Sequence, residues 1–266
     1  YSYSLSLKAE KSFDFGLDLA ASYTFTQSKS LCPATSSQAA SNWNNTSTYR
    51  FSNAPELGYS AYNLPHMIKA SAFYRFHIAN NKNFTTTIGV IYQGRSGSPY
   101  SMLYSGDLNG DNGRGNDLMF IPTDEQIDLM PFKAQGNYTE ELQRQNLKAW
   151  LAKTPYLKDH RGEYFKRNAD NLPFENHFDF HVAEKMSVKV GKQVHSLELS
   201  LDILNVGNLL NKDWGRTYGT TYSNELISPL TYDGGKFQFL STPDYVIKYP
   251  QSYYSRWRGQ LGLKYT

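Results

Sequence analysis

The acidic segment DLNGDNG, which starts at Asp107, carries the side chains with the clearest chemistry in this sequence. Oxygen-bearing side chains recur at Asp107, Asn109 and Asp111, and Asp117 follows on the same segment. Calcium takes about six to eight oxygen ligands, and glycines between them let the chain turn tightly. The match to a calcium loop is incomplete, because Gly113 comes at the seventh position instead of the sixth and no Glu stands at the twelfth. We therefore expect either a calcium site formed by Asp107, Asn109, Asp111 and Asp117, or a loop whose side chains bond to their own backbone.

Two histidines, His177 and His181, lie on either side of Asp179 at alternate positions. On a β-strand these three side chains would share one face. A zinc ion would need a further ligand from elsewhere, whereas a row of polar side chains also suits the wall of a water-filled lumen. Charged residues continue on this face and on the same face of the following strand, which predicts cross-strand charge pairs. They are Lys185, Lys189, Glu198 and Asp202.

Three tryptophans lie in long segments between the predicted strands, together with clusters of tyrosine. Trp43, Trp150 and Trp214 are candidates for a ligand-binding surface, because loops on a rigid scaffold commonly carry binding residues. Packing of the loops on one another is the alternative, and the sequence leaves both open.

No motif for catalysis is present, so we assign no enzymatic activity. The sequence lacks a Gly-x-Ser-x-Gly elbow, a His-Glu-x-x-His pair and a Gly-x-x-x-x-Gly-Lys phosphate loop. The single cysteine, Cys32, excludes an internal disulfide framework and a cysteine-based zinc site. The net charge of +3 comes from 27 basic and 24 acidic residues spread along the chain, which argues against a nucleic-acid partner.

The segments that must position these residues show alternating apolar and polar side chains. In the segment SFDFGLDLAASYTFT, residues 12–26, the odd positions from Phe13 to Phe25 are apolar and the even positions are mostly polar. This period of two predicts a long β-strand with two different faces. Strands in soluble domains usually have about five or six residues, whereas a strand that crosses a membrane needs roughly nine to eleven. No run of about 18 apolar residues occurs that would predict a transmembrane helix.

Seven segments show this alternation, and the connections between them are short and long in turn. The predicted strands are 1–10, 12–26, 67–78, 84–95, 177–190, 197–203 and 256–266. The short connections lie near Glu10–Lys11, Asn81 and Lys192, and the long ones are 27–63, 96–173 and 207–251. Outer-membrane barrels have short periplasmic turns and long extracellular loops. The sequence therefore predicts an all-β fold, a transmembrane antiparallel up-and-down β-barrel segment, with an ordinary all-β core as the alternative. Short helices are expected in the second long loop at 123–130 and 139–153.

An up-and-down bacterial barrel needs an even number of strands, so seven strands predict part of a larger barrel. We expect more sequence before Tyr1. Leu261, Leu263 and Tyr265 are in phase with position 267, where we expect the aromatic residue, phenylalanine, that generally ends such barrels.

Four further segments carry a resemblance to a known family. They are DILNVGNLLNKDWG (202–215), NLPHMIKASAFYRF (63–76), GDLNGDNGRGNDLMFIP (106–122) and TSSQAASNW (35–43). Together with the terminal strand RGQLGLKY, they resemble TonB-dependent outer-membrane transporters of the Bacteroidota type, the Oar-like group with an N-terminal carboxypeptidase-regulatory-like domain. The resemblance implies a 22-stranded barrel, of which residues 1–266 would be the C-terminal portion with the last seven strands.

The resemblance also implies a function and partners. It implies active import across the outer membrane of a Gram-negative bacterium, with outer-membrane lipid around the barrel and an unknown extracellular ligand, held with or without a surface lipoprotein partner. The TonB complex would act through a plug and an N-terminal box, neither of which is recognisable in this sequence. A passive porin or a structural or adhesive barrel is the alternative, and a soluble calcium-dependent β-module is a third. Siderophore, glycan, peptide and protein cargo all remain open.

Overall fold

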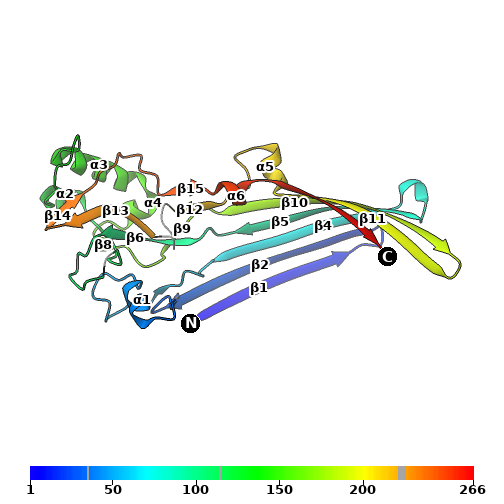
Figure 1. Ribbon diagram of the computed structural model, residues 1–266, viewed down its shortest axis with the longest axis horizontal. Helices are drawn as coiled ribbons and strands as arrows, with labels where there is room; N and C mark the ends of the chain where they lie inside the picture. Colours follow the sequence, from blue (N-terminus) through cyan, green and yellow to red (C-terminus); the bar gives the residue numbers. More distant parts are fainter. Residues whose placement is uncertain (35, 114, 221–225) are drawn as a thin grey trace.

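The structure, a computed structural model, describes residues 1–34, 36–113, 115–220 and 226–266. Seven long strands form one antiparallel sheet in which each pairs with the next long strand along the chain (Figure 1). They are β1 (Ser2–Ser12), β2 (Leu17–Ser30), β4 (His66–Phe76), β5 (Phe84–Arg95), β10 (Glu175–Val190), β11 (Gln193–Leu204) and β16 (Arg258–Tyr265). A short strand, β3 (Gly58–Tyr59), pairs with the end of β2 that leads into the first long connection. The predicted strands and their meander order are confirmed.

The first hairpin turns at Phe13–Gly16, so the prediction of a turn at Glu10–Lys11 was wrong. β1 continues through both charged residues, and Lys11 pairs with Leu19 on β2. The Phe13 amide then donates to the Leu17 carbonyl at 2.8 Å. Gly16 has a φ of +97°, and a Cβ there would lie 2.1 Å from the Arg75 carbonyl oxygen, so the turn requires glycine. A charged pair is common in turns, but here the hydrogen bonds to β2 keep it extended.

The strands are staggered, as strands tilted within a barrel must be. β4 ends two residues beyond the partner of Leu17, the first residue of β2. β10 ends four residues beyond the partner of Phe84, the first residue of β5. β1 and β16 are the two edges and do not pair with each other in the described chain, so the sheet is open.

The two longest connections fold together into a second unit, here called the outer body, which consists of the described residues of 96–174 and 205–257. Its largest sheet pairs β6 (Pro99–Ser105) in parallel with β13 (Leu226–Asp233), flanked by β9 (Asp170–Asn171) and β14 (Lys236–Gln238). Two small pairs join β7 (Phe120–Ile121) to β8 (Glu163–Tyr164) and β12 (Tyr218–Thr220) to β15 (Lys248–Pro250). Figure 1 shows this unit at the loop end of the long sheet.

Both helices predicted in the second long loop are present. α2 (Asp124–Leu129) begins with a capping box, in which Thr123 and Gln126 bond reciprocally. α3 (Glu140–Lys153) begins after Thr139, whose hydroxyl accepts from the Leu142 amide at 3.2 Å. The remaining helices are α1 (Ala39–Asn44), η1 (Ile78–Asn80), α4 (Pro155–Asp159), α5 (Val206–Leu210) and α6 (Ser252–Ser255). None of the helices in the described ranges is long and apolar enough to cross a membrane.

The hydrophobic core lies in the outer body, not in the long sheet. Among the described residues, Ala183 is the only buried apolar side chain that belongs to the seven long strands. The largest fully buried side chains are Trp150, Phe132, Phe165, Phe239 and Met102. A sheet this long with its apolar side chains exposed needs something apolar against it, whereas the outer body is packed like a globular domain.

Candidate functional site

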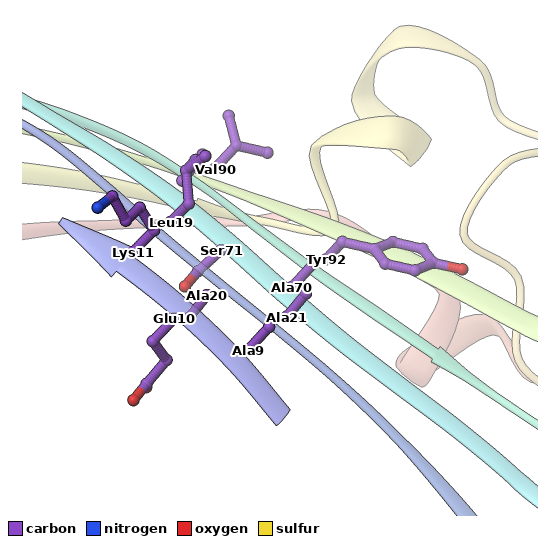
Figure 2. Close-up of a pocket in the computed structure, with 11 residues that line it drawn as sticks. Ala9, Glu10, Lys11, Leu19, Ala20, Ala21, Ala70, Ser71, Val90 and Tyr92 are labelled. Atoms are coloured by element: carbon purple, nitrogen blue, oxygen red, sulfur yellow. The ribbon is translucent and has the colours of Figure 1, made fainter. Parts of the chain in front are cut away.

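One face of the long sheet is apolar across its width. The register aligns one row of six side chains, Leu17, Tyr74, Ile88, Val182, Leu201 and Leu261. Figure 2 shows two members of the next row, Leu19 and Val90, on one side of the sheet and Glu10 and Ser71 on the opposite side. A slip of one residue in any pair of strands would move an apolar side chain to the polar face. The register therefore builds a single continuous apolar surface.

Aromatic side chains gather at both ends of this surface. At the turn end they are Phe15, Tyr74, Phe76, Phe84 and Tyr265, and at the loop end Tyr23, Phe25, Tyr92 and Phe178. On β5, the distance from Phe84 to Tyr92 is about 26 Å along the strand at the usual rise. With a tilt of about 40°, that corresponds to about 20 Å of depth. Membrane barrels have an apolar band about 25 Å tall between two aromatic girdles, and this surface has that pattern.

Glu184 interrupts the apolar set of β10 between Val182 and Met186. Its Oε2 accepts a hydrogen bond from the hydroxyl of Thr86, its partner on β5. Its Oε1 is buried and has no partner among the described residues. A carboxylate on an apolar surface is costly unless it is paired, so the Thr86 contact is the compensation that the fold provides.

The opposite face of the sheet is polar and carries cross-strand pairs. His181 Nδ1 lies 2.6 Å from Asp202 Oδ1, a hydrogen-bonded pair that joins β10 to β11. Asp179 accepts from the Asn205 amide at 2.7 Å. Glu175 accepts from Arg95 Nε at 2.8 Å and lies 3.8 Å from His177 Nε2. His177, Asp179 and His181 thus each have a partner of their own.

Of the predicted charge pairs, the register places Lys185 opposite Glu198 on this polar face, whereas Lys189 is opposite Val194. Within the described chain, no group of three or more histidine, cysteine or carboxylate side chains is arranged to hold a metal ion. His177, Asp179 and His181 share the polar face of β10, the arrangement expected for the wall of a water-filled lumen.

The structure separates the three tryptophans proposed as ligand contacts. Trp150 is 1% exposed; its indole donates to the Tyr245 carbonyl at 3.2 Å and its ring lies 5.5 Å from that of Phe239. This position agrees with the alternative that the tryptophan packs the loops on one another. Trp43 is partly buried on α1 and donates to Asn53 at 2.7 Å. Trp214 follows α5 and is 56% exposed.

The acidic loop uses most of its oxygens on its own backbone. The Asp107 carboxylate accepts from the amides of Gly110, Asp111 and Asn112. Asp111 accepts from the amide and hydroxyl of Ser52 at 2.8 and 2.7 Å and from the Gly113 amide at 2.8 Å. The Asn109 side-chain oxygen accepts from the Asp111 amide at 2.9 Å. These contacts match the alternative to a calcium site, a loop whose side chains bond to their own backbone.

Two buried oxygens in this loop have no partner among the described residues, Oδ1 of Asn116 and Oδ1 of Asp117. Burial is the main cause that raises the pKa of Asp117, and the nearby Asp111 and Asp107 add to the effect. Calcium binding through Asp107, Asn109, Asp111 and Asp117 stays a prediction. Terbium luminescence of the wild-type protein and of Asp117→Asn would test it.

A cavity of about 540 Å³ lies where the first long connection meets residues 163–167 of the outer body. Its lining includes the rings of Tyr49 and Tyr164, stacked with their centroids 4.7 Å apart. The ammonium of Lys29, at the end of β2, lies 5.0 Å from the ring centroid of Tyr59. Aromatic faces and charged groups together suit a polar ligand with at least one planar or apolar face.

Arg167 fixes this cavity to the wall. It is buried, and its guanidinium donates to the carbonyls of Leu31 at 2.7 Å, Ser30 and Glu56. Burial lowers the pKa of Arg167. The sequence showed only that tyrosines are numerous in the loops; it could not show that segments around residues 30, 50 and 165 meet.

Comparison with known proteins supplies the family. No curated protein and no solved structure matches the chain. A family model described as "Outer membrane beta barrel domain" matches residues 2–225, which include the first six of the seven long strands. The apolar face with its two aromatic girdles is the surface that such a domain presents to lipid. The chain therefore belongs to the outer membrane beta barrel domain family and is located in the outer membrane of a Gram-negative bacterium.

Proposed function

We propose that this chain forms part of the barrel wall and the ligand-binding outer loops of a TonB-dependent active importer. The four segments that resemble such transporters support this proposal. They lie on the wall and on its loops: residues 63–76 include β4, residues 202–215 include the end of β11 and all of α5, and the other two lie in long connections.

The observation that carries the proposal is the outer body. Two connections far apart in sequence share one core at the loop end of a membrane wall. The cavity lined by Tyr49, Tyr59 and Tyr164 lies between this unit and the first long connection, and Arg167 joins it to β2. A rigid, preformed pocket on extracellular loops suits capture of a ligand before transport. Passive diffusion through a porin needs a wall and an open lumen and no such unit.

The import step rests on the resemblance. Ligand binding would close the loops over the lumen, and the TonB complex would displace a plug outside residues 1–266. The open edges of β1 and β16 must be paired in a membrane, because no water is present to satisfy their backbone groups. We propose that further strands of a larger barrel, 22 in all, satisfy them.

Planar bilayer recording of the native full-length protein tests the proposal without knowledge of the cargo. A plugged importer conducts almost no ions at rest and opens only when the plug is unfolded by urea. A passive porin conducts steadily from the moment of insertion. Steady conductance without urea would therefore overturn the importer proposal in favour of a porin.

A further inference from the structure

The segment after β11 folds back over the outer end of the apolar face. A groove of about 320 Å³ lies between this segment and β10, and its lining includes Phe174, Asn176, Phe178, Trp214, Arg216 and Tyr218. Asn176 and Phe178 lie on the same face of β10 as its apolar side chains, opposite Gly94 and Tyr92 of β5. The groove is therefore continuous with the surface that faces lipid. Figure 1 shows α5 standing clear of the sheet beside the outer end of β10.

Hydrogen bonds hold this segment in place. Asn205 has a left-handed backbone, and its side chain donates to the carbonyls of Gly215 and Ser255, each at 2.9 Å. Asn208 donates to the carbonyls of Lys212 and Trp214, both at 3.1 Å. The segment is thus an ordered turn, and its hydrogen bonds fix the positions of its side chains.

The turn exposes apolar side chains. Leu210 is 75% exposed, Leu209 and Trp214 are also exposed, and so is the neighbouring Phe174. The amphipathic ring of tryptophan is favoured at membrane interfaces, where one end is apolar and the other is wet. Exposed leucines and tryptophan at the rim of a membrane-facing surface indicate contact with lipid.

Positive charge lies beside this apolar rim. Lys212 makes no ion pair with any residue of the described chain. Arg216 pairs with Asp213 through one nitrogen and donates from Nε to the Lys212 carbonyl at 3.2 Å. The turn therefore has one more positive charge than negative, next to a groove that suits an acyl chain.

We propose that the turn Val206–Arg216 binds a phosphorylated lipid of the outer leaflet, with an acyl chain in the groove against Trp214 and Phe178 and the anionic headgroup at Lys212 and Arg216. Two observations carry this choice of occupant: the groove continues the lipid-facing surface, and the charge at its rim complements a phosphate. The proposal rests on the membrane location and not on transport. Under it, Trp214 contacts lipid and not cargo.

Quenching of tryptophan fluorescence by brominated lipids tests the apolar part. The native full-length protein is reconstituted in phosphatidylcholine vesicles that contain phosphatidylglycerol brominated near the headgroup or deep in the chain. We expect Trp214→Phe to remove part of the fluorescence that brominated lipid quenches, and the part removed should be larger for the shallow bromines. Trp43→Phe on α1 should leave the quenching unchanged. If aqueous iodide quenches the fluorescence of Trp214 and brominated lipid does not, the proposal is overturned.

Native mass spectrometry tests the headgroup part. One basic residue at an anionic surface changes the lipid equilibrium about five-fold, so Lys212→Gln should lower retention of phosphatidylglycerol over phosphatidylcholine by about that factor. Lys236→Gln, exposed on β14 in the outer body, is the matched control and should change nothing. Heat-modifiable electrophoretic mobility shows whether each variant is folded. Equal effects of the two variants on lipid retention, or no effect of Lys212→Gln in folded protein, would overturn headgroup recognition.

Discussion

An arginine placed on one or the other face of β16 tests which face of the sheet contacts lipid. Leu261 is 76% exposed on the apolar face and pairs with Leu201 of β11. An arginine on the lipid face near the bilayer midplane costs about 2–4 kcal/mol, so Leu261→Arg should lower the free energy of unfolding by about that amount. Gln260 is on the opposite face and pairs with Asp202. Gln260→Arg puts the same charge beside a carboxylate, and we expect a change within about 0.5 kcal/mol.

The measurement is guanidinium unfolding of the native full-length protein in phosphatidylcholine vesicles, followed by tryptophan fluorescence. Midpoint and slope together give the free energy of unfolding, and an unchanged slope shows that the variants unfold from the same native state. Leu261→Ala is the control for the lost apolar side chain, because it adds no charge. A loss from Gln260→Arg equal to or larger than that from Leu261→Arg would refute the assignment of the faces.

Three further predictions concern the outer body. Trp150→Ala should destabilise the outer body by about 3–5 kcal/mol, the usual cost of such a cavity. Hydrogen exchange should become faster in α3, while β10 keeps its protection. Equal loss of protection in α3 and β10 would contradict a separate core. Arg167→Met should speed exchange at residues 29–31 and 56–59, since three carbonyls lose a donor, whereas the exposed Lys166→Met should not. Because the pKa of Asp117 is raised in the folded state, its protonated form is favoured there, so stability is greatest below the unfolded pKa and falls as pH rises through the folded one. Thermal unfolding between about pH 3 and 7 should show this slope in the wild type and a smaller slope in Asp117→Asn; parallel curves would contradict it.

The wall of this protein could be read from the sequence, because its main signal is local. Each strand carries its own alternation, and short turns leave few registers in which two apolar faces coincide. The seven strands, their order and the two-faced sheet followed from this. The first turn was misplaced by a few residues, since only the hydrogen bonds of β1 to β2 show that Glu10 and Lys11 stay extended.

The tertiary structure alone decided what the long connections do. The parallel pairing of β6 with β13 joins segments more than a hundred residues apart, and no periodicity within either segment encodes it. Trp150 and Phe239, and likewise Arg167 and Leu31, also meet from distant parts of the chain. A tryptophan in a polar loop has the same sequence signature whether it packs a core or meets a ligand. The sequence by itself therefore determined a membrane wall with an apolar and a polar face, and the fold determined the core, the cavity and the lipid-facing turn, because these depend on contacts between distant residues.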